Sequence, residues 1–456
     1  MRKLISSFLI VALAVCSLSF CTATNVKAEK NEWPGGPGLY GESAVMIEAS
    51  TDTVLYSKKM DKKMYPASIT KIMTALLTIE NCKMDETVVY SDAAVNSLSY
   101  DDANIACQVG EKMSVKECLY ALMLSSANEV ATALGEHIAG STKEFAKMMN
   151  ERAAKAGAKH THFENANGLH DVNHYVTAYD MAMIMKDALQ YPSFCEIINT
   201  TEYTIQKNNK RKDSFASYQR HKMVWPTSGY YYEGIIGGKT GYTDQAGTTL
   251  VTAAKRNGMT LITVVLHSNG TNVYKDTAAL LDFGFDNFNL KNVSANDTRF
   301  KDDSMSFQSP FTDTKDSIHL DEDSTVVLPK KASFSSLKTS VEFNQTADSF
   351  ATITYNYYDR TVGSAKLVYS SSSDSDNKDI ETTAKAVKEK NKDKKATKKE
   401  SASTANKSPK SRIKIPKTLI RIFVVVLILS VIIIFMILQK RRLDHIRQMK
   451  RHRNRS

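Results

Sequence analysis

The first 382 residues of this chain lack the excess of basic side chains that the whole sequence shows. The formal net charge is +11 at pH 7, but residues 383–456 contain 22 Lys and Arg side chains and only 4 Asp and Glu side chains. The remainder is therefore net acidic, and a basic tail does not form a nucleic-acid-binding surface on a folded domain. We expect no nucleic-acid partner.

Long apolar runs are absent between residues 21 and 417, which excludes an internal membrane span over that stretch. The N-terminal run follows Arg2 and Lys3 and precedes a small-residue cleavage signal that ends at Ala28. This pattern predicts a secretory signal peptide over residues 1–28 and an exported protein.

The C-terminal segment 422–438 is uninterrupted by charge. Together with residues 418–420 ahead of it, its length suits a bilayer core of ~30 Å and predicts a transmembrane helix over residues 418–438. The basic residues after it, 439–456, are expected to form a cytoplasmic tail. Residues 370–411 are almost free of large apolar side chains, so a disordered polar and basic linker is predicted over residues 370–417. The expected location is the cell membrane, with a single span and an extracytoplasmic catalytic domain.

Cysteine is scarce in the part that remains after processing. Two of the six cysteines lie in the signal peptide, which leaves Cys82, Cys107, Cys118 and Cys195. Export permits disulfide bonds, but the sequence does not assign their pairing. Cys118 lies in an apolar run with helical spacing and is predicted to be a buried free thiol.

Three short motifs occur in one order along the chain: Ser68-Ile69-Thr70-Lys71, Ser126-Ala127-Asn128 and Lys239-Thr240-Gly241. They match the S-x-x-K, S-x-N and K-T-G set of serine acyl-transferases that react with penicillin. Each motif alone is common, but the ordered triple indicates an active site.

The first motif has the residue types that nucleophilic catalysis requires. Positions three apart lie on one face of a helix, so Lys71 is expected beside Ser68. A buried lysine near other cations loses proton affinity and can act as the base for the serine hydroxyl. Taken alone, the motif also fits a serine that caps an ordinary helix, with a solvated lysine one turn later.

The second and third motifs supply polar groups for the substrate. Ser126 can relay a proton and Asn128 can bind an amide, although a polar turn between helices is the alternative. The segment around Lys239 and Thr240 is rich in glycine and precedes two alternating runs, so antiparallel strands with a carboxylate site are predicted. The alternative is a glycine-rich hairpin with an exposed lysine.

With these motifs, the chain resembles the D-alanyl-D-alanine carboxypeptidases of the low-molecular-weight penicillin-binding protein family, in the serine peptidase class. The resemblance covers about residues 43–369 and is carried by residues 66–71, 125–129, 165–169, 174–180 and 238–247. It implies Ser68 as the acylated nucleophile, Lys71 as its base, and Ser126 in proton relay.

The resemblance also implies how the substrate is held. By this resemblance, Asn128 binds the substrate amide. The terminal carboxylate is held by the K-T-G motif, that is, by Lys239 and Thr240 with Gly241. The oxyanion hole is formed by the backbone N–H groups of Ser68 and Tyr242. The implied reaction is removal of the terminal D-Ala from peptidoglycan stem pentapeptides. It needs no cofactor and no metal, and β-lactam antibiotics are expected to act as covalent inhibitors.

The expected architecture has two exported domains. A serine β-lactamase/transpeptidase-like catalytic domain over residues 29–288 belongs to the α/β (α+β) class, with helices on an antiparallel sheet. Strict alternation over 350–357 and 361–369 predicts a hairpin within a small all-β domain at 289–369.

Two features differ from the family pattern. Alanine stands at position 127, where relatives often have glycine, and no arginine precedes the helix expected near Asp276. Lys275 is a candidate replacement for that arginine, which is thought to assist carboxylate binding.

The sequence leaves three other functional classes open. A metal-dependent D,D-peptidase could use the histidines between His160 and His174, but zinc peptidases place a glutamate beside paired histidines and only Asp171 is adjacent here. A β-lactamase-like enzyme and a non-catalytic wall-binding relative are the remaining alternatives.

Overall fold

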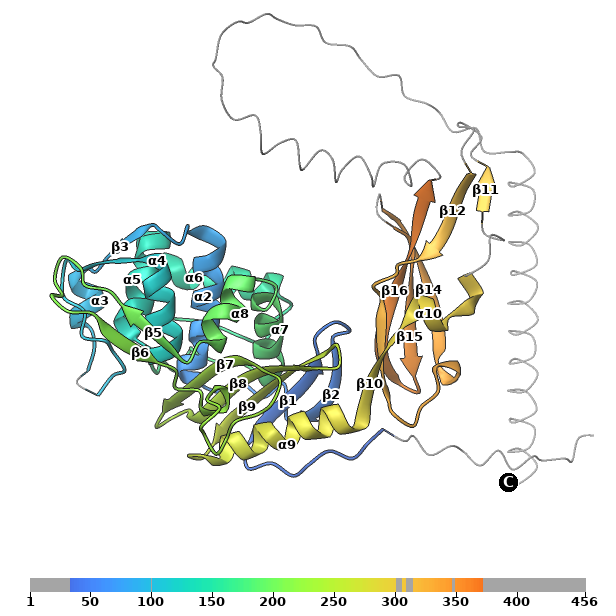
Figure 1. Ribbon diagram of the computed structural model, residues 1–456, viewed down its shortest axis with the longest axis horizontal. Coiled ribbons are helices and arrows are strands. Elements are labelled where there is room, and N and C mark those ends of the chain that lie inside the picture. Colours follow the sequence, from blue (N-terminus) through green and yellow to red (C-terminus); the bar gives the residue numbers. More distant parts are fainter. Residues whose placement is uncertain (1–32, 100, 301–305, 309–314, 347–348, 372–456) are drawn as a thin grey trace, which may run out of the picture. The chain divides into compact units, whose positions relative to one another are not determined.

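The computed structural model describes residues 33–99, 101–300, 306–308, 315–346 and 349–371 (Figure 1). The predicted signal peptide, transmembrane helix and cytoplasmic tail lie outside these residues, as does the predicted linker beyond Ser371. Among the described residues, no helix has both the length and the apolar character needed to cross a membrane.

The first sheet carries the K-T-G strand at its edge. Its antiparallel strands follow the order β2-β1-β9-β8-β7, and their bounds are β1 Ser43–Glu48, β2 Thr53–Lys58, β7 Ile235–Thr243, β8 Gly247–Arg256 and β9 Met259–Ser268. The predicted hairpin is confirmed, because β8 pairs with β9 across Asn257 and Gly258. Both turn residues have positive φ, 51° and 80°, as a tight turn between twisted strands requires.

Both faces of this sheet are buried by helices. In β1, Val45 and Ile47 belong to one hydrophobic core, whereas Ala44 and Met46 belong to a second. This division follows from the two-residue period of a strand. Helix α9 (Asn272–Asn287) covers the second face, and the remaining helices of this part lie on the first (Figure 1).

Helix α2 (Lys71–Asn81) lies at the centre of the helical layer, and most of its residues are buried. The elements around it are α3 Asp92–Asn96, α4 Val115–Tyr120, a π-helical turn Ala121–Ser125, α5 Asn128–Ala139, α6 Thr142–Lys155, α7 Ala178–Ala188 and α8 Pro192–Asn199. Two small two-stranded sheets complete the layer: β3 Thr87–Val89 with β4 Lys112–Ser114, and β5 Glu202–Ile205 with β6 Phe215–Tyr218. Cys118 lies buried in α4 as a free thiol, as predicted.

The second sheet follows α9 and has its own hydrophobic core. Its strands are β10 Phe288–Asn292, β11 Ser306–Gln308, β12 Lys315–Leu320, β13 Thr325–Pro329, β14 Lys338–Thr346, β15 Ser349–Tyr357 and β16 Arg360–Ser371, with the short helix α10 Val293–Asn296. Strands β15 and β16 form the predicted hairpin, and alternate residues of β15 are buried. Strand β16 includes the first two residues assigned to the linker.

Helix α9 packs closely against the first sheet at Gly284. A Cβ atom added there would lie 2.4 Å from Leu261 Cδ1 and 2.9 Å from Met46 Sδ. Gly284→Ala should therefore lower the free energy of unfolding by about 1–2 kcal/mol, because overpacking outweighs the gain in helix propensity. Urea denaturation measures this difference.

The control for this substitution is Gly229→Ala. An added Cβ at Gly229 meets no described atom within 4 Å, so its urea midpoint should match that of the unmodified chain. An unchanged midpoint for Gly284→Ala would contradict the close packing of α9.

Candidate active site

Ser68 lies in a 3-10 turn, Ala67–Thr70, that leads into α2 at Lys71. The sequence predicted a helix from Ser68, so the observed first turn is tighter than expected. In a 3-10 turn, side chains three positions apart eclipse each other, which places the lysine directly beside the serine. The Lys71 Nζ to Ser68 Oγ distance is 2.8 Å.

The backbone of this turn is held in an unusual conformation. Ala67 has φ +52°, a left-handed value that costs energy for a residue with a side chain. Gly168 packs against its carbonyl so closely that an added Cβ would lie 1.9 Å from the Ala67 oxygen. Thr249 Oγ1 also donates a hydrogen bond of 2.9 Å to the Pro66 carbonyl. This turn, Ala67–Thr70, is named the nucleophile turn for the predicted role of Ser68. It is thus fixed by two distant segments.

Lys71 is completely buried and makes hydrogen bonds to three segments of the chain. Besides Ser68, Lys71 Nζ donates to Asn128 Oδ1 at 2.6 Å and to the Asn167 carbonyl at 2.7 Å. Burial lowers the pKa of Lys71 well below its ordinary value, and the positive charges of Lys239 and Arg220 lower it further. The site therefore favours the neutral amine.

The second motif lies where the π-helical turn Ala121–Ser125 gives way to α5. Ser126 has φ +63°, so the chain reverses there and α5 begins at Asn128. This change of direction brings both motif side chains to the same place: Asn128 contacts Lys71, and Ser126 Oγ accepts a 3.0 Å hydrogen bond from Lys239 Nζ.

The third motif lies on β7, the edge strand of the first sheet. Lys239 Nζ donates to Ser126 Oγ and, at 2.9 Å, to the Thr240 carbonyl. Burial, followed by the charge of Arg220, lowers the pKa of Lys239 to about 7. Gly241 lies against the nucleophile turn, since an added Cβ would be 2.9 Å from the Ser68 backbone nitrogen and 2.4 Å from Thr249 Oγ1.

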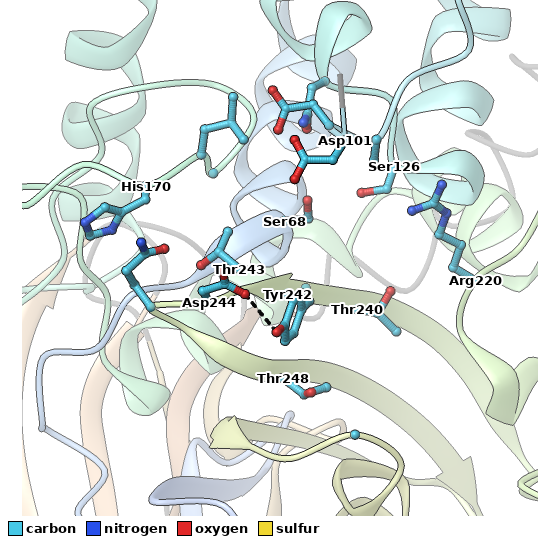
Figure 2. A pocket seen from close by; sticks show the side chains of 18 of the residues that line it. Ser68, Asp101, Ser126, His170, Arg220, Thr240, Tyr242, Thr243, Asp244 and Thr248 are labelled. Carbon is cyan, nitrogen blue, oxygen red and sulfur yellow. Dashed lines mark hydrogen bonds between the residues drawn. The ribbon is translucent and has the colours of Figure 1, made fainter. Parts of the chain in front are cut away.

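A cleft of about 820 Å³ opens above these groups. Figure 2 shows Ser68, Ser126, Thr240 and Tyr242 around it, and Asn128 and Gly241 also line it. Lys71 and Lys239 are buried behind the lining residues. The structure thus brings all the predicted site residues together.

Arg220 was not identified from the sequence, yet its side chain lines the cleft (Figure 2). It belongs to none of the three motifs, so only spatial proximity reveals it. Its charge acts on both buried lysines, and partial burial lowers the pKa of Arg220 itself. Lys275, the suggested replacement for the family arginine, is instead exposed and is not among the lining residues. The cleft lining therefore favours the alternative that the carboxylate is recognised differently from the family pattern, and it includes the guanidinium of Arg220.

The histidines between positions 160 and 174 do not form a metal-ligand group. His174 Nε2 is 3.0 Å from Thr70 Oγ1, and His174 Nδ1 accepts a hydrogen bond from the Glu164 backbone N–H. Burial lowers the pKa of His174 to about 4, so it is a neutral residue that joins its loop to the nucleophile turn. Among the described residues, the one group of His, Cys, Asp or Glu with ligand spacing lies elsewhere.

Comparison with known proteins agrees with this site. The family model described as D-alanyl-D-alanine carboxypeptidase matches residues 30–270. The chain therefore belongs to the D-alanyl-D-alanine carboxypeptidase family of serine peptidases. The function predicted from the three motifs is confirmed at the level of this family.

Two curated relatives are similar along the catalytic part. The D-alanyl-D-alanine carboxypeptidase DacF of Bacillus subtilis is 34% identical over 297 residues, which is 63% of this chain and 72% of that protein. The enzyme DacA of Haemophilus influenzae is 30% identical over 263 residues, or 55% of this chain and 63% of that protein.

Solved structures confirm the transpeptidase-like fold. The DD-transpeptidase of Streptomyces K15 has a TM-score of 0.52 and 28% identity, and the match covers 56% of this chain and 100% of that one. Penicillin-binding protein 6B from Escherichia coli has a TM-score of 0.56 and 23% identity over 74% of this chain and 98% of that one. The second likeness concerns the fold alone.

The contact between β7 and the nucleophile turn gives a direct test. Gly241→Ala should slow covalent labelling by a fluorescent penicillin roughly 100-fold, because the added methyl group displaces β7 from Ser68 and misplaces the reacting groups. Gly229→Ala is the matched control and should label at the unmodified rate. A folded Gly241→Ala variant that labels at the same rate as the control would contradict this geometry.

Proposed function

We propose that the chain removes the terminal D-Ala from peptidoglycan stem pentapeptides through an acyl-enzyme on Ser68. The observation that carries this proposal is the hydrogen bonding of Lys71. Two of its partners, Asn128 Oδ1 and the Asn167 carbonyl, are acceptors only.

A neutral lysine amine has two N–H donors and one lone pair. In the structure Lys71 Nζ also donates to Ser68 Oγ at 2.8 Å. In the proposed neutral amine the two acceptors take both donors, so the lone pair accepts a hydrogen bond from the Ser68 hydroxyl instead. The depressed pKa of Lys71 favours the neutral amine, which can accept the hydroxyl proton as the serine oxygen attacks. The backbone N–H groups of Ser68 and Tyr242 are proposed to stabilise the resulting oxyanion.

The cationic side of the cleft suits the terminal carboxylate of the substrate. Thr240 and Arg220 line the cleft and Lys239 lies directly behind them, so a hydroxyl and two positive groups are within one region. We assign carboxylate binding to these three residues. The amide of Asn128 also lines the cleft and is proposed to bind the peptide backbone.

The proposed reaction has two steps. A bond forms between Ser68 Oγ and the carbonyl carbon of the penultimate D-Ala, and the C–N bond to the terminal D-Ala breaks. The proton that Lys71 accepted from Ser68 passes through the Ser126 hydroxyl to the leaving nitrogen, which departs as the amine of free D-Ala; Ser126 Oγ already accepts a hydrogen bond from Lys239. Water then hydrolyses the ester and regenerates Ser68. A β-lactam would form the same type of ester, which accounts for its expected inhibition.

Replacing the nucleophile tests this mechanism. Ser68→Ala should abolish hydrolysis of a D-Ala-D-Ala peptide and labelling by fluorescent penicillin, with a loss of several orders of magnitude in rate. Mass spectrometry of the penicillin adduct provides the measurement. Stoichiometric labelling of the folded variant would show that another residue is acylated.

The two buried lysines predict a bell-shaped pH profile for kcat/KM. Raising the pH deprotonates Lys71 and supplies the base, so kcat/KM rises on the acid side. Raising it further, through the pKa of about 7 of Lys239, removes the positive charge that binds the carboxylate, so kcat/KM falls. Steady-state kinetics with a D-Ala-D-Ala peptide measures both limbs.

Lys239→Arg identifies the alkaline limb. Arginine stays protonated, so the fall in kcat/KM above pH 7 should disappear even where the maximum rate is reduced. The matched control is Lys275→Arg, which makes the same substitution at an exposed lysine and should leave the pH profile of kcat/KM unaltered. An alkaline limb that persists in Lys239→Arg would assign it to another group.

We further propose that the enzyme acts outside the cytoplasmic membrane, anchored by residues 418–438. The support is the sequence: a signal-peptide pattern at the N-terminus, a long apolar run near the C-terminus and basic residues after it. Protease added to cells stripped of wall should digest the catalytic domain and spare an epitope at the C-terminus. The opposite protection pattern would overturn the proposed orientation.

A further inference from the structure

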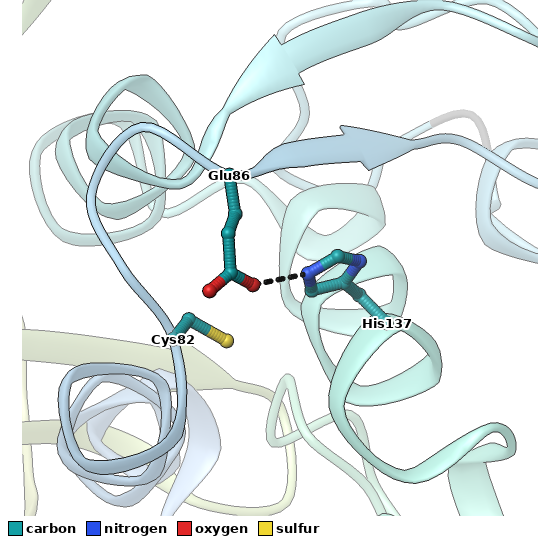
Figure 3. A group of neighbouring side chains, drawn as sticks. All are labelled: Cys82, Glu86 and His137. Carbon is teal, nitrogen blue, oxygen red and sulfur yellow. Dashed lines mark hydrogen bonds and ion pairs between the residues drawn. The ribbon is translucent and has the colours of Figure 1, made fainter. Parts of the chain in front are cut away.

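A second group of reactive side chains lies away from the cleft. Figure 3 shows Cys82, Glu86 and His137 pointing toward one another. Cys82 is the residue that ends α2, Glu86 immediately precedes β3, and His137 is in the last turn of α5. One ligand atom from each lies within 4.8 Å of the other two, and His137 Nε2 is 3.3 Å from Glu86 Oε2.

We propose that Cys82, Glu86 and His137 bind a zinc ion. A thiolate, an imidazole and a carboxylate are all established zinc ligands, and the combination of a soft sulfur with nitrogen favours zinc over calcium or magnesium. Ligand atoms around tetrahedral zinc are ~3.3–3.8 Å apart, given the usual metal–ligand bond lengths. His137 and Glu86 already have this spacing at 3.3 Å, and the remaining pairs, all within 4.8 Å, need to close by no more than about 1–1.5 Å. Water would occupy the fourth position.

The surroundings favour a cation at this place. The C-terminal ends of α2 and α5 both lie at the cluster, and the carbonyl end of a helix carries partial negative charge. Without metal, burial and the neighbouring Glu86 raise the pKa of the Cys82 thiol to about 11. A zinc ion would replace the thiol proton of Cys82. Glu86 already accepts a hydrogen bond from the Lys83 backbone N–H through Oε1, so its Oε2, which faces His137, is the oxygen offered to the ion.

The positions of the ligands indicate what the ion would do. Helix α2 starts at Lys71 and α5 starts at Asn128, the two residues that meet in the active site, whereas Cys82 and His137 lie at the opposite ends of these helices. Zinc would therefore join the far ends of the two helices that carry the site. We assign it a structural role, independent of the acyl-transfer chemistry.

Cobalt(II) titration of the purified full-length chain under reducing conditions tests thiolate ligation. The unmodified chain should bind one equivalent with a thiolate-to-cobalt charge-transfer band in the near ultraviolet, and zinc should displace it. Cys82→Ser should lose the band. Cys195→Ser is the matched control, because Cys195 is also half-buried but donates to the Leu189 carbonyl and has no place in the cluster. A band that is absent from the unmodified chain, or unchanged in Cys82→Ser, overturns the proposal.

Thermal unfolding gives a second readout that does not depend on the cysteine variant. Zinc at about 100 times its dissociation constant should raise the Tm of the unmodified chain by roughly 5 °C, because it binds only the folded state. His137→Gln should weaken cobalt binding at least tenfold and reduce this rise, whereas His162→Gln should show the full rise. Equal zinc stabilisation of His137→Gln and the unmodified chain would refute the assigned ligand set.

Discussion

The burial of Lys71 is the constraint on which the active site depends. An amine removed from water must replace its lost hydration with protein partners, and Lys71 obtains them from the starts of two helices and from a loop. The turn at Ser68, the start of α5 at Asn128 and the loop at Asn167 must therefore stay in contact. The same burial depresses the pKa of Lys71, so the contacts that hold the site together also suit this lysine to the proposed role of base.

Two residues adopt strained backbone conformations that allow the three segments around Lys71 to meet. Ala67 and Ser126 adopt left-handed conformations that cost energy for residues with side chains, and Gly168 provides the space against which the nucleophile turn rests. The edge position of β7 then brings Lys239 against Ser126 and Gly241 against Ser68. Burial, followed by the positive charges nearby, lowers the pKa of both lysines: Lys239 and Arg220 act on Lys71, and Arg220 acts on Lys239.

Much of the fold was predictable because its signals are local. The alternation in β8 and β9, and in β15 and β16, has the period of strands and ends at turn residues, so both hairpins were predicted correctly. The 3-10 turn before α2 and the π-helical turn before Ser126 were not predicted. Both turns depend on contacts with residues far away in the chain. Their local sequence fits an ordinary α-helix just as well, so the pattern does not distinguish them.

The sequence by itself determined which chemical groups take part: a serine with a lysine three positions later, a serine and asparagine pair, and a lysine on a glycine-rich strand. Only the tertiary structure decided how those groups behave, because burial and charge proximity are sums over residues far apart in the chain. It brought Arg220 into the cleft and left Lys275 exposed, although neither residue has a motif that distinguishes it. It also joined Cys82, Glu86 and His137, which come together only because two helices that begin at the active site end beside each other.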